Sequence, residues 1–132
     1  MKKKYDVVAL GELLIDFTEN GFSEQGNPIL EVNPGGAPCN VLAMLQKLGH
    51  KTAFIGKVGN DQFGRFLKNK IKKCGISADN LVISCSENTT LTFVETKSDG
   101  DREFSFYRKP GADMMLTEDD INYDIINKAK VF

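Results

Sequence analysis

The sequence predicts an α/β fold, and three observations support this prediction. Two short apolar segments, Tyr5 to Leu10 and Thr52 to Gly59, are typical of parallel strands that helices cover on both faces. Each precedes a segment with apolar residues at helical spacing, which gives the order strand, helix, strand, helix. The chain length of 132 residues suffices for one domain with its own core.

The segment after the first strand predicts a small hairpin. LLIDFTE is extended, the turn-rich NGFSEQGNP follows it, and PILEVN forms a short return strand. We therefore expect this hairpin to branch off the main sheet.

Two helices are predicted between residues 38 and 75. Pro38 suits the first position of a helix, where its missing N–H costs nothing, and Gly49 ends that helix. Asp61 is placed to cap the second helix, which Gly75 closes. The expected apolar stripes are Val41, Leu42, Leu45 and Leu48 in the first helix, and Phe63, Phe66, Leu67, Ile71 and Cys74 in the second.

A second hairpin and a third helix complete the predicted elements. LTFVETK and REFSFYR flank SDGD, an Asp-Gly turn typical of a hairpin. Thr117 and the three acids after it mark a helix start, with Ile121, Ile125, Ile126 and Ala129 as its apolar stripe. The closing KVF is typical of the opening of a buried strand, so we expect these residues to be the first part of a longer domain.

Composition excludes several classes of partner. Lys and Arg total 17 and Asp and Glu total 18, so neither a basic surface for nucleic acid nor an acidic tail is expected. No run of about 18 apolar residues is present to span a membrane, and Asp6, Glu12 and Asp16 interrupt the N-terminal segment, unlike a secretory signal. The three cysteines lack CxxC spacing and indicate neither a disulfide framework nor a zinc site. These features favour a cytoplasmic protein with a small-molecule ligand.

The segment NPGGAPCN places two glycines and a proline at the start of a predicted helix. Such a helix start suits phosphate, but Pro38 removes one N–H donor, and neither a Walker A motif nor a GxGxxG pattern is present. The remaining groups are the backbone of Gly35 and Gly36, the Asn40 amide and the Asp16 carboxylate, which match the hydroxyl groups of a sugar. From spacing alone, a tight turn that binds nothing explains these residues equally well.

Other candidate positions are weaker. Phe104, Phe106 and Arg108 share one strand face, so they either close over a polar ligand or pack on their own sheet or a second subunit. His50 follows the helix end and is expected at the surface, not in a catalytic triad or a metal site. Cys39 is expected to be a small buried filler.

Several ordered motifs resemble those of a known family. GG-x-x-x-N at Gly35 to Asn40 is followed by the LG of Leu48-Gly49 and by IGKVGNDQFG from Ile55 to Gly64. LGELLIDF precedes these motifs and DREFSFYRKPGADMML follows them. Together they resemble the N-terminal signature of the ribokinase-like, PfkB-type carbohydrate kinases, and bacterial fructokinases in particular, over nearly the whole chain.

The resemblance implies a fold and roles for individual residues. The expected fold is part of a ribokinase-like three-layer αβα sandwich with a small β-sheet lid, formed by strands within residues 12–33 and 90–108, and a homodimer through the lid. The resemblance makes Asp16, Gly36 and Asn40 sugar-hydroxyl contacts, while Gly35 lets the backbone come close. Phe106 and Arg108 lie where related sugar-acid kinases place substrate contacts. The signature residues Gly56, Gly59, Asp61 and Gly64 are interpreted as turn and helix-cap chemistry.

The implied reaction is transfer of the γ-phosphoryl group of ATP, with Mg²⁺, to the 6-hydroxyl of fructose, giving fructose 6-phosphate. The family's catalytic aspartate lies in a Gly-Ala-Gly-Asp motif near the far end of the domain, in the half that binds ATP, and this sequence contains no such motif. No residue is therefore assigned as the catalytic base, which is expected beyond residue 132, and the chain alone is expected to be inactive.

Two alternatives to the fructokinase interpretation stay open. Leu14 stands where ribose kinases carry an asparagine, which favours fructose over ribose. The first alternative is a kinase for a 2-keto-3-deoxy sugar acid or another sugar, and Arg108 keeps the acid open because a guanidinium binds a carboxylate bidentately. The last alternative is a truncated sugar-binding or structural piece without catalysis.

Overall fold

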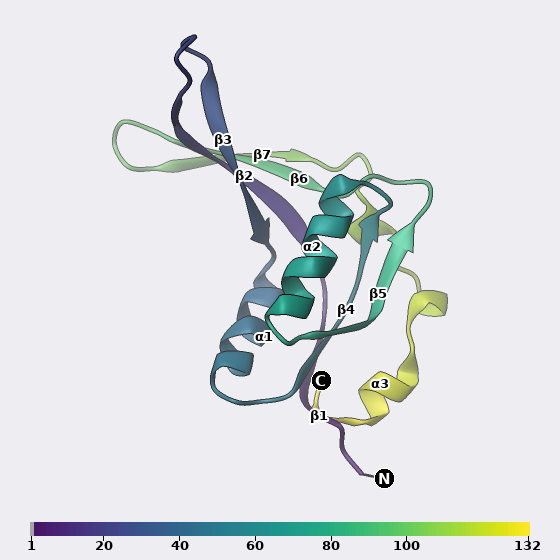
Figure 1. Cartoon of the computed structure of the whole chain (residues 1–132). Coiled ribbons are helices and arrows are strands. Elements are labelled where there is room, and N and C mark those ends of the chain that lie inside the picture. Colours follow the sequence, from purple (N-terminus) through teal and green to yellow (C-terminus); the bar gives the residue numbers. More distant parts are fainter. Residues whose placement is uncertain (1) are drawn as a thin grey trace.

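The computed structural model describes residues 2–132, which form two four-stranded sheets with helices on the first of them (Figure 1). The elements in chain order are β1 (Tyr5–Leu10), β2 (Leu14–Phe22), β3 (Pro28–Gly35), α1 (Ala37–Lys47), β4 (Thr52–Gly59), α2 (Gln62–Lys73), β5 (Ser77–Ser84), β6 (Leu91–Thr96), β7 (Arg102–Tyr107), the 3₁₀ turns η1 (Ala112–Met115) and η2 (Glu118–Asp120), α3 (Tyr123–Asn127) and β8 (Ala129–Val131).

The main sheet is parallel and has the strand order β5-β4-β1-β8. β1, β4, both expected helices and the short closing strand lie within a residue or two of their predicted positions. β5 was not predicted. Its polar residues Ser77, Asp79 and Asn80 break the apolar run that marks a buried strand, although Asn80 is buried and donates to the carbonyl of Asp120.

Two apolar clusters cover the two faces of the main sheet. One lies under α1 and α2 and contains Leu13, Ile15, Cys39, Leu42, Phe54, Val58, Leu67, Ile71, Ile76 and Leu81. The other lies under α3 and contains Tyr5, Val8, Ala53, Ile55, Ile125 and Ala129. Helices on both faces of a parallel sheet confirm the predicted α/β class.

The second sheet projects from the main body, and we call it the projecting sheet (Figure 1). Its order is β3-β2-β6-β7, with β2 antiparallel to β3, β2 parallel to β6, and β6 antiparallel to β7. Both predicted hairpins are therefore confirmed, and β2 and β6 join them side by side.

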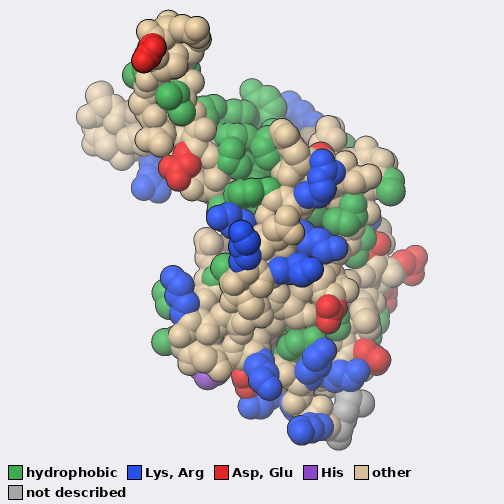
Figure 2. Space-filling model, in the orientation of Figure 1, with side chains coloured by type: hydrophobic (Ala, Val, Ile, Leu, Met, Phe, Trp, Pro, Cys, Tyr) green, Lys and Arg blue, Asp and Glu red, His purple; other side chains and the backbone are tan. Residues whose placement is uncertain are grey.

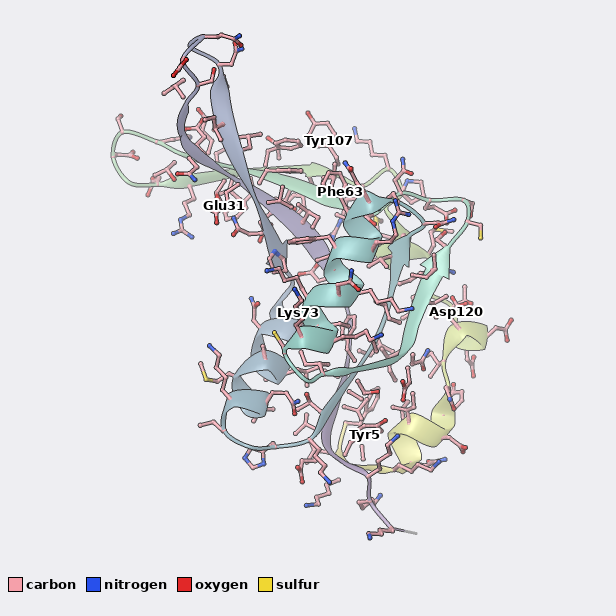
Figure 3. The ribbon with its side chains drawn as sticks, viewed as in Figure 1. Tyr5, Glu31, Phe63, Lys73, Tyr107 and Asp120 are labelled. Carbon is pink, nitrogen blue, oxygen red and sulfur yellow. The ribbon has the colours of Figure 1, made fainter. Side chains whose placement is uncertain are left out.

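Aromatic contacts join one face of the projecting sheet to α2. The Phe17 ring lies 5.5 Å from the Phe63 ring of α2 and 4.9 Å from the Phe93 ring. Phe93 in turn contacts Tyr107 at 4.9 Å. Phe63 and Tyr107 are labelled at this junction in Figure 3, and hydrophobic side chains gather there in Figure 2. Because side chains alternate along a strand, the opposite face carries Asp16.

The expected apolar stripe of α1 is only partly buried. Leu42 is fully buried, whereas Val41 and Leu48 are 57% and 67% exposed, and Cys39 is buried in their place. The stripe prediction was wrong at Val41 and Leu48, because the buried side of α1 is narrow and consists of Cys39 and Leu42. The second helix follows its prediction more closely, with Leu67 and Ile71 buried.

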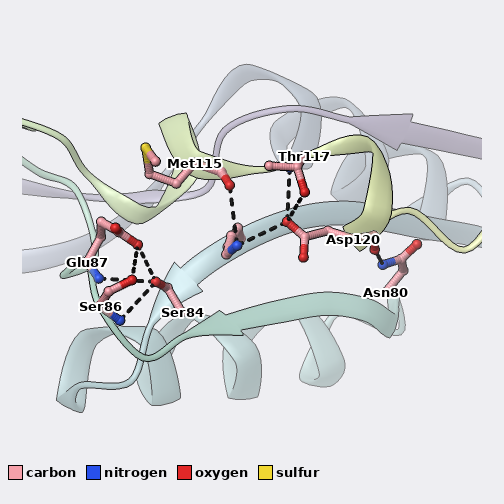
Figure 4. A network of polar contacts seen from close by, with 8 residues as sticks. Asn80, Ser84, Ser86, Glu87, Met115, Thr117 and Asp120 are labelled. Atoms are coloured by element: carbon pink, nitrogen blue, oxygen red, sulfur yellow. Dashed lines mark hydrogen bonds and ion pairs between the residues drawn. The ribbon is translucent and has the colours of Figure 1, made fainter.

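The third helix does not begin at Thr117 as predicted. The acids after Thr117 form the 3₁₀ turn η2, and the α-helix is limited to Tyr123–Asn127. The Asp120 carboxylate accepts from the Thr117 backbone N–H at 2.9 Å and from Lys57 Nζ at 3.0 Å (Figure 4). Since Lys57 of β4 also donates to the Met115 carbonyl, this polar network holds the segment as a turn against the main sheet.

Candidate functional site

The site predicted from the sequence lies where the projecting sheet joins the main body. Asp16 is on β2, and the register of the hairpin places Gly35 opposite Leu14 and Asn33 opposite Asp16. A Cβ atom on Gly35 would lie 2.3 Å from Asp16 Oδ2, so the Gly35 backbone packs directly against the carboxylate. The hairpin therefore brings together an acid group and bare backbone from opposite strands.

Gly36 turns the chain from β3 into α1. Its φ of 123° is strained for any residue with a side chain, and a Cβ there would lie 2.5 Å from the Glu12 carbonyl oxygen. The Gly36 carbonyl accepts from the Asn40 backbone N–H at 3.2 Å, which places Asn40 one turn into α1. The Asn40 side chain is exposed and accessible to a ligand. Asp16, Gly35, Gly36 and Asn40 thus gather at the foot of the first hairpin.

Burial raises the pKa of the Asp16 carboxyl above its usual range, and the nearby Glu12 carboxylate raises it further. The Thr92 hydroxyl beside the carboxyl partly offsets this rise. That hydroxyl is buried, and its geometry falls short of a hydrogen bond to any described residue. Thr92 is therefore a second polar group next to Asp16 with unused hydrogen-bonding capacity.

The sheet register extends this row of side chains to β7. Thr92 pairs with Asp16 on one side and with Phe106 on the other. Cross-strand partners share a face, so Asn33, Asp16, Thr92 and Phe106 line the face opposite the α2 junction. Phe106 is 51% exposed on this face.

Arg108 lies beyond the end of β7, with its guanidinium carbon 5.2 Å from the centre of the Phe106 ring. Its Nη2 atom donates to Glu12 Oε2 at 3.1 Å and to Asp113 Oδ2 at 2.8 Å. The Thr90 hydroxyl donates a short bond to the other oxygen of Asp113. Through Glu12, Arg108 connects to the neighbourhood of Asp16.

Sequence reasoning missed Glu12, Thr92 and Asp113. Each had a weak signal: Glu12 and Asp113 lie inside the quoted motifs LGELLIDF and DREFSFYRKPGADMML, and Thr92 is a polar residue among the apolar residues that begin β6. Their proposed roles depend on contacts between segments far apart in the chain, such as Glu12 and Arg108, which are 96 positions apart.

A wide depression lies beside Phe106 and Arg108, not at Asp16. It measures about 820 Å³ and is lined by residues 86–88 and 105–110. Gly35 and Asn40 instead line a small cavity of about 70 Å³ next to Cys39 and Ile71. Asp16 is the better candidate for the centre of the site, because its carboxyl has a raised pKa and the Gly35 backbone packs directly against it. The larger depression is wide open to solvent.

The other residues considered in the sequence analysis have structural roles or lie at the surface, as predicted. Burial raises the pKa of the Cys39 thiol to about 12, which excludes an activated thiolate there, and His50 is exposed. Asp61 caps α2 by accepting from the Gly64 N–H at 2.8 Å. A Cβ on Gly64 would lie 2.0 Å from the Gly59 carbonyl oxygen, so these two glycines serve close packing.

The described residues offer no metal site and no membrane span. Between residues 2 and 132, no group of three His, Cys, Asp or Glu residues is placed to hold a metal ion. No helix in the described part of the chain is long and apolar enough to cross a bilayer.

Solved structures confirm that the fold is ribokinase-like. The fructokinase of Xylella fastidiosa aligns with a TM-score of 0.87 and 32% identity over 94% of this chain and 38% of its own. A second Xylella fastidiosa fructokinase structure, with bound ATP, aligns with a TM-score of 0.83. The fructokinase of Halothermothrix orenii aligns with a TM-score of 0.82 and 31% identity over 96% of this chain and 45% of its own.

Sequence comparison identifies the family. Probable fructokinase-5 of Arabidopsis thaliana and the fructokinase of Solanum tuberosum are each 47% identical over 96% of this chain. The match covers 40% of either relative, so the chain spans less than half the length of these relatives. Residues 4–132 match the model described as pfkB family carbohydrate kinase, and the chain therefore belongs to this family.

Proposed function

We propose that this chain is the sugar-binding part of an ATP-dependent kinase that phosphorylates fructose to fructose 6-phosphate. The observation that carries the proposal is the packing of Gly35 backbone against the Asp16 carboxylate, beside the exposed amide of Asn40. A carboxylate accepts two hydroxyl protons, and an amide both donates and accepts, which suits vicinal hydroxyls of a ketose. The fructokinases among the relatives support fructose as the substrate.

The projecting sheet serves as a lid in this proposal. Phe106 and Arg108 lie on or next to the face that carries Asp16, where they cover a sugar held at the foot of the hairpin. Closing this face over the substrate excludes water, which protects the phosphoryl donor from hydrolysis. The role of the present residues is thus binding, orientation and exclusion of water.

ATP and Mg²⁺ belong to the proposed reaction, in which ATP supplies the phosphoryl group and Mg²⁺ neutralises its charge. The described residues do not fit either group. Pro38 removes a donor from the glycine-rich helix start, and no acidic cluster is placed to hold a metal ion between residues 2 and 132. The catalytic base and the ATP site are therefore assigned to parts of the kinase outside this sequence.

A cytoplasmic location and a homodimer complete the proposal. The three cysteines are unpaired, as expected in a reducing compartment. Phe104 on one face of the lid and Tyr107 on the other are more than half exposed and offer apolar surface to a second subunit. Analytical ultracentrifugation of the complete gene product tests the dimer, and a single monomeric species at micromolar concentration would contradict it.

Steady-state kinetics of the complete gene product tests the function. We expect coupled ADP release with fructose, and a loss of at least tenfold in kcat/KM for Asp16→Ala and for Asn40→Ala, because hydrogen bonds to charged or buried groups contribute about 1–3 kcal/mol each. Asp79→Ala and Asn69→Ala remove the same groups from exposed positions and serve as matched controls. Equal activity of all four variants would refute the site.

The isolated chain gives a complementary test. We expect residues 1–132 to release no ADP from ATP in the presence of fructose, since the described residues hold neither a phosphate cradle nor a metal site. Steady turnover by this chain would place the catalytic base within it and overturn the proposed division of roles.

A further inference from the structure

Arg108 is connected to the proposed sugar site through Glu12, and its surroundings bear on which sugars bind there. An uncommitted guanidinium at the lid would bind the carboxylate of a sugar acid through two parallel hydrogen bonds. Whether Arg108 discriminates between neutral and acidic sugars therefore depends on how many of its donors are already in use.

The two ion pairs of Arg108 engage the same nitrogen. Nη2 donates to Glu12 Oε2 at 3.1 Å and to Asp113 Oδ2 at 2.8 Å, which uses both of its protons. A guanidinium binds a carboxylate bidentately through either Nη1 with Nη2 or Nε with Nη2, so Nη2 is common to both arrangements. Nε has no hydrogen-bond partner among the described residues, but it is buried and therefore not accessible to a ligand. Neither bidentate geometry is left for a substrate carboxylate.

The local charge also opposes an anionic ligand. One guanidinium faces two carboxylates, and the Asp16 carboxyl lies close enough to Glu12 for their charges to interact. The Asp113 side chain is only 4% exposed and is held by Thr90, so it does not swing away from Arg108 to make room. A buried, hydrogen-bonded ion pair of this kind is costly to break from one side.

We propose that Glu12 and Asp113 block Arg108 as a carboxylate receptor, and that this pairing makes the site select neutral sugars over sugar acids. Glu12 and Asp113 are specificity-determining residues in this inference, and Arg108 is left with Nη1 as a donor to hydroxyl groups. The inference rests on the proposed function and narrows it, because it disfavours the 2-keto-3-deoxy sugar acid that Arg108 had kept open.

Kinetics with paired substrates tests the inference on the complete gene product. The pairs are fructose with 2-keto-3-deoxygluconate, glucose with glucuronate, and galactose with galacturonate. We expect the ratio of kcat/KM for the acid to kcat/KM for its neutral partner to rise at least tenfold in Glu12→Gln and Asp113→Asn. Glu103→Gln is the matched control, because it removes a charge from β7 at an exposed side chain that does not contact Arg108. Its ratio is expected to stay within twofold of wild type.

The outcomes separate this inference from the proposed function. An unchanged ratio in Glu12→Gln and Asp113→Asn, or a wild-type protein that uses the acids as well as the neutral sugars, overturns the inference. Turnover of glucose or galactose but not fructose overturns the fructokinase proposal, while the ratio within that pair still decides the inference. If no sugar is phosphorylated, calorimetric affinities for the same pairs decide it. If Asp113→Asn fails to fold in a thermal melt, Glu12→Gln alone is decisive.

Discussion

Burial and the Glu12 carboxylate raise the pKa of the Asp16 carboxyl, so its ionised form lowers the stability of the fold. We therefore expect Asp16→Asn to raise the free energy of unfolding of residues 1–132 at pH 7. This gain in the free energy of unfolding is fully present above the pKa that the Asp16 carboxyl has in the folded protein. It disappears as the pH falls from that pKa to the unfolded value of about 3.9, since the wild-type carboxyl is then protonated in both states.

Thermal melts at pH 7 and below pH 4 measure this difference. Asp79→Asn, at an exposed position, controls for the loss of one negative charge. In the complete enzyme the same Asp16→Asn change is expected to weaken sugar binding. If Asp16→Asn is less stable than wild type at pH 7, the Asp16 carboxylate stabilises the fold. The residue would then be explained by stability alone, without a bound ligand.

Gly35 sets the space that the Asp16 carboxylate occupies. A Cβ at this position would lie 2.3 Å from Asp16 Oδ2 and 2.8 Å from Leu14 Cδ1, so Gly35→Ala displaces the carboxylate. We expect a tenfold or greater loss of kcat/KM for fructose and an overpacking cost of about 1–3 kcal/mol. Gly100→Ala, at a φ of 90° with open space around it, is expected to lose stability without losing affinity. If Gly35→Ala and Gly100→Ala lose stability and kcat/KM to the same extent, the effect of Gly35→Ala on activity is explained by its loss of stability alone.

At the scale of the elements, α2 depends on one capping carboxylate. Asp61 accepts from the Gly64 N–H, the Thr89 N–H and the Thr89 hydroxyl, each at 2.8 Å, and so ties α2 to the segment that leads into β6. Burial alone would raise the pKa of Asp61, but these hydrogen bonds outweigh it and lower the pKa overall. The stability that Asp61 contributes is present above the unfolded pKa of about 3.9 and is lost as the pH falls through the folded value.

Asp61→Ala is therefore expected to lower the free energy of unfolding by about 1–3 kcal/mol at pH 7. Urea titration of residues 1–132 measures the change, and Asp119→Ala, an exposed acid, is the control. A loss that persists unchanged at pH 3 would show that packing rather than the charged cap accounts for it.

Local patterns predicted most elements but not the polar contacts between them. Apolar runs identified β1 and β4, and turn residues identified both hairpins, because these signals lie within a few neighbouring residues. β5 escaped because Asn80 is buried only through its bonds to the distant segment at Asp120 and Asn122. The helix expected at Thr117 failed for a similar reason, since Lys57 of β4 binds Asp120 there.

The residues of the candidate site also divide into those that local motifs predict and those that depend on contacts between distant segments. Asp16, Gly35, Gly36 and Asn40 were predicted from motifs, and the structure places them together at the foot of one hairpin. Glu12 and Asp113 were not predicted, because their proposed role depends on a shared contact with Arg108 that no local pattern encodes.

At the scale of the whole molecule, the two sheets share one core. β2 belongs to the projecting sheet, yet Ile15 at its start is fully buried in the cluster under α1 and α2. Two residues further along, the Phe17 ring contacts Phe63 of α2. The geometry around Asp16, between these two anchors, is thus fixed by the packing of the main body.

This shared core predicts a single unfolding transition for residues 1–132. We expect thermal melts followed by far-ultraviolet circular dichroism and by resolved amide signals of β6 and β7 to coincide, since the projecting sheet has no separate core to melt around. Phe17→Ala is expected to lower stability by about 2–3 kcal/mol while keeping the two probes coincident, because the contact with Phe63 couples both parts. Phe22→Ala, at a ring that is 72% exposed, is the control and is expected to change stability little. Loss of the β6 and β7 signals well below the main transition would mean that the projecting sheet unfolds independently, and that the site at its base is not held by the core.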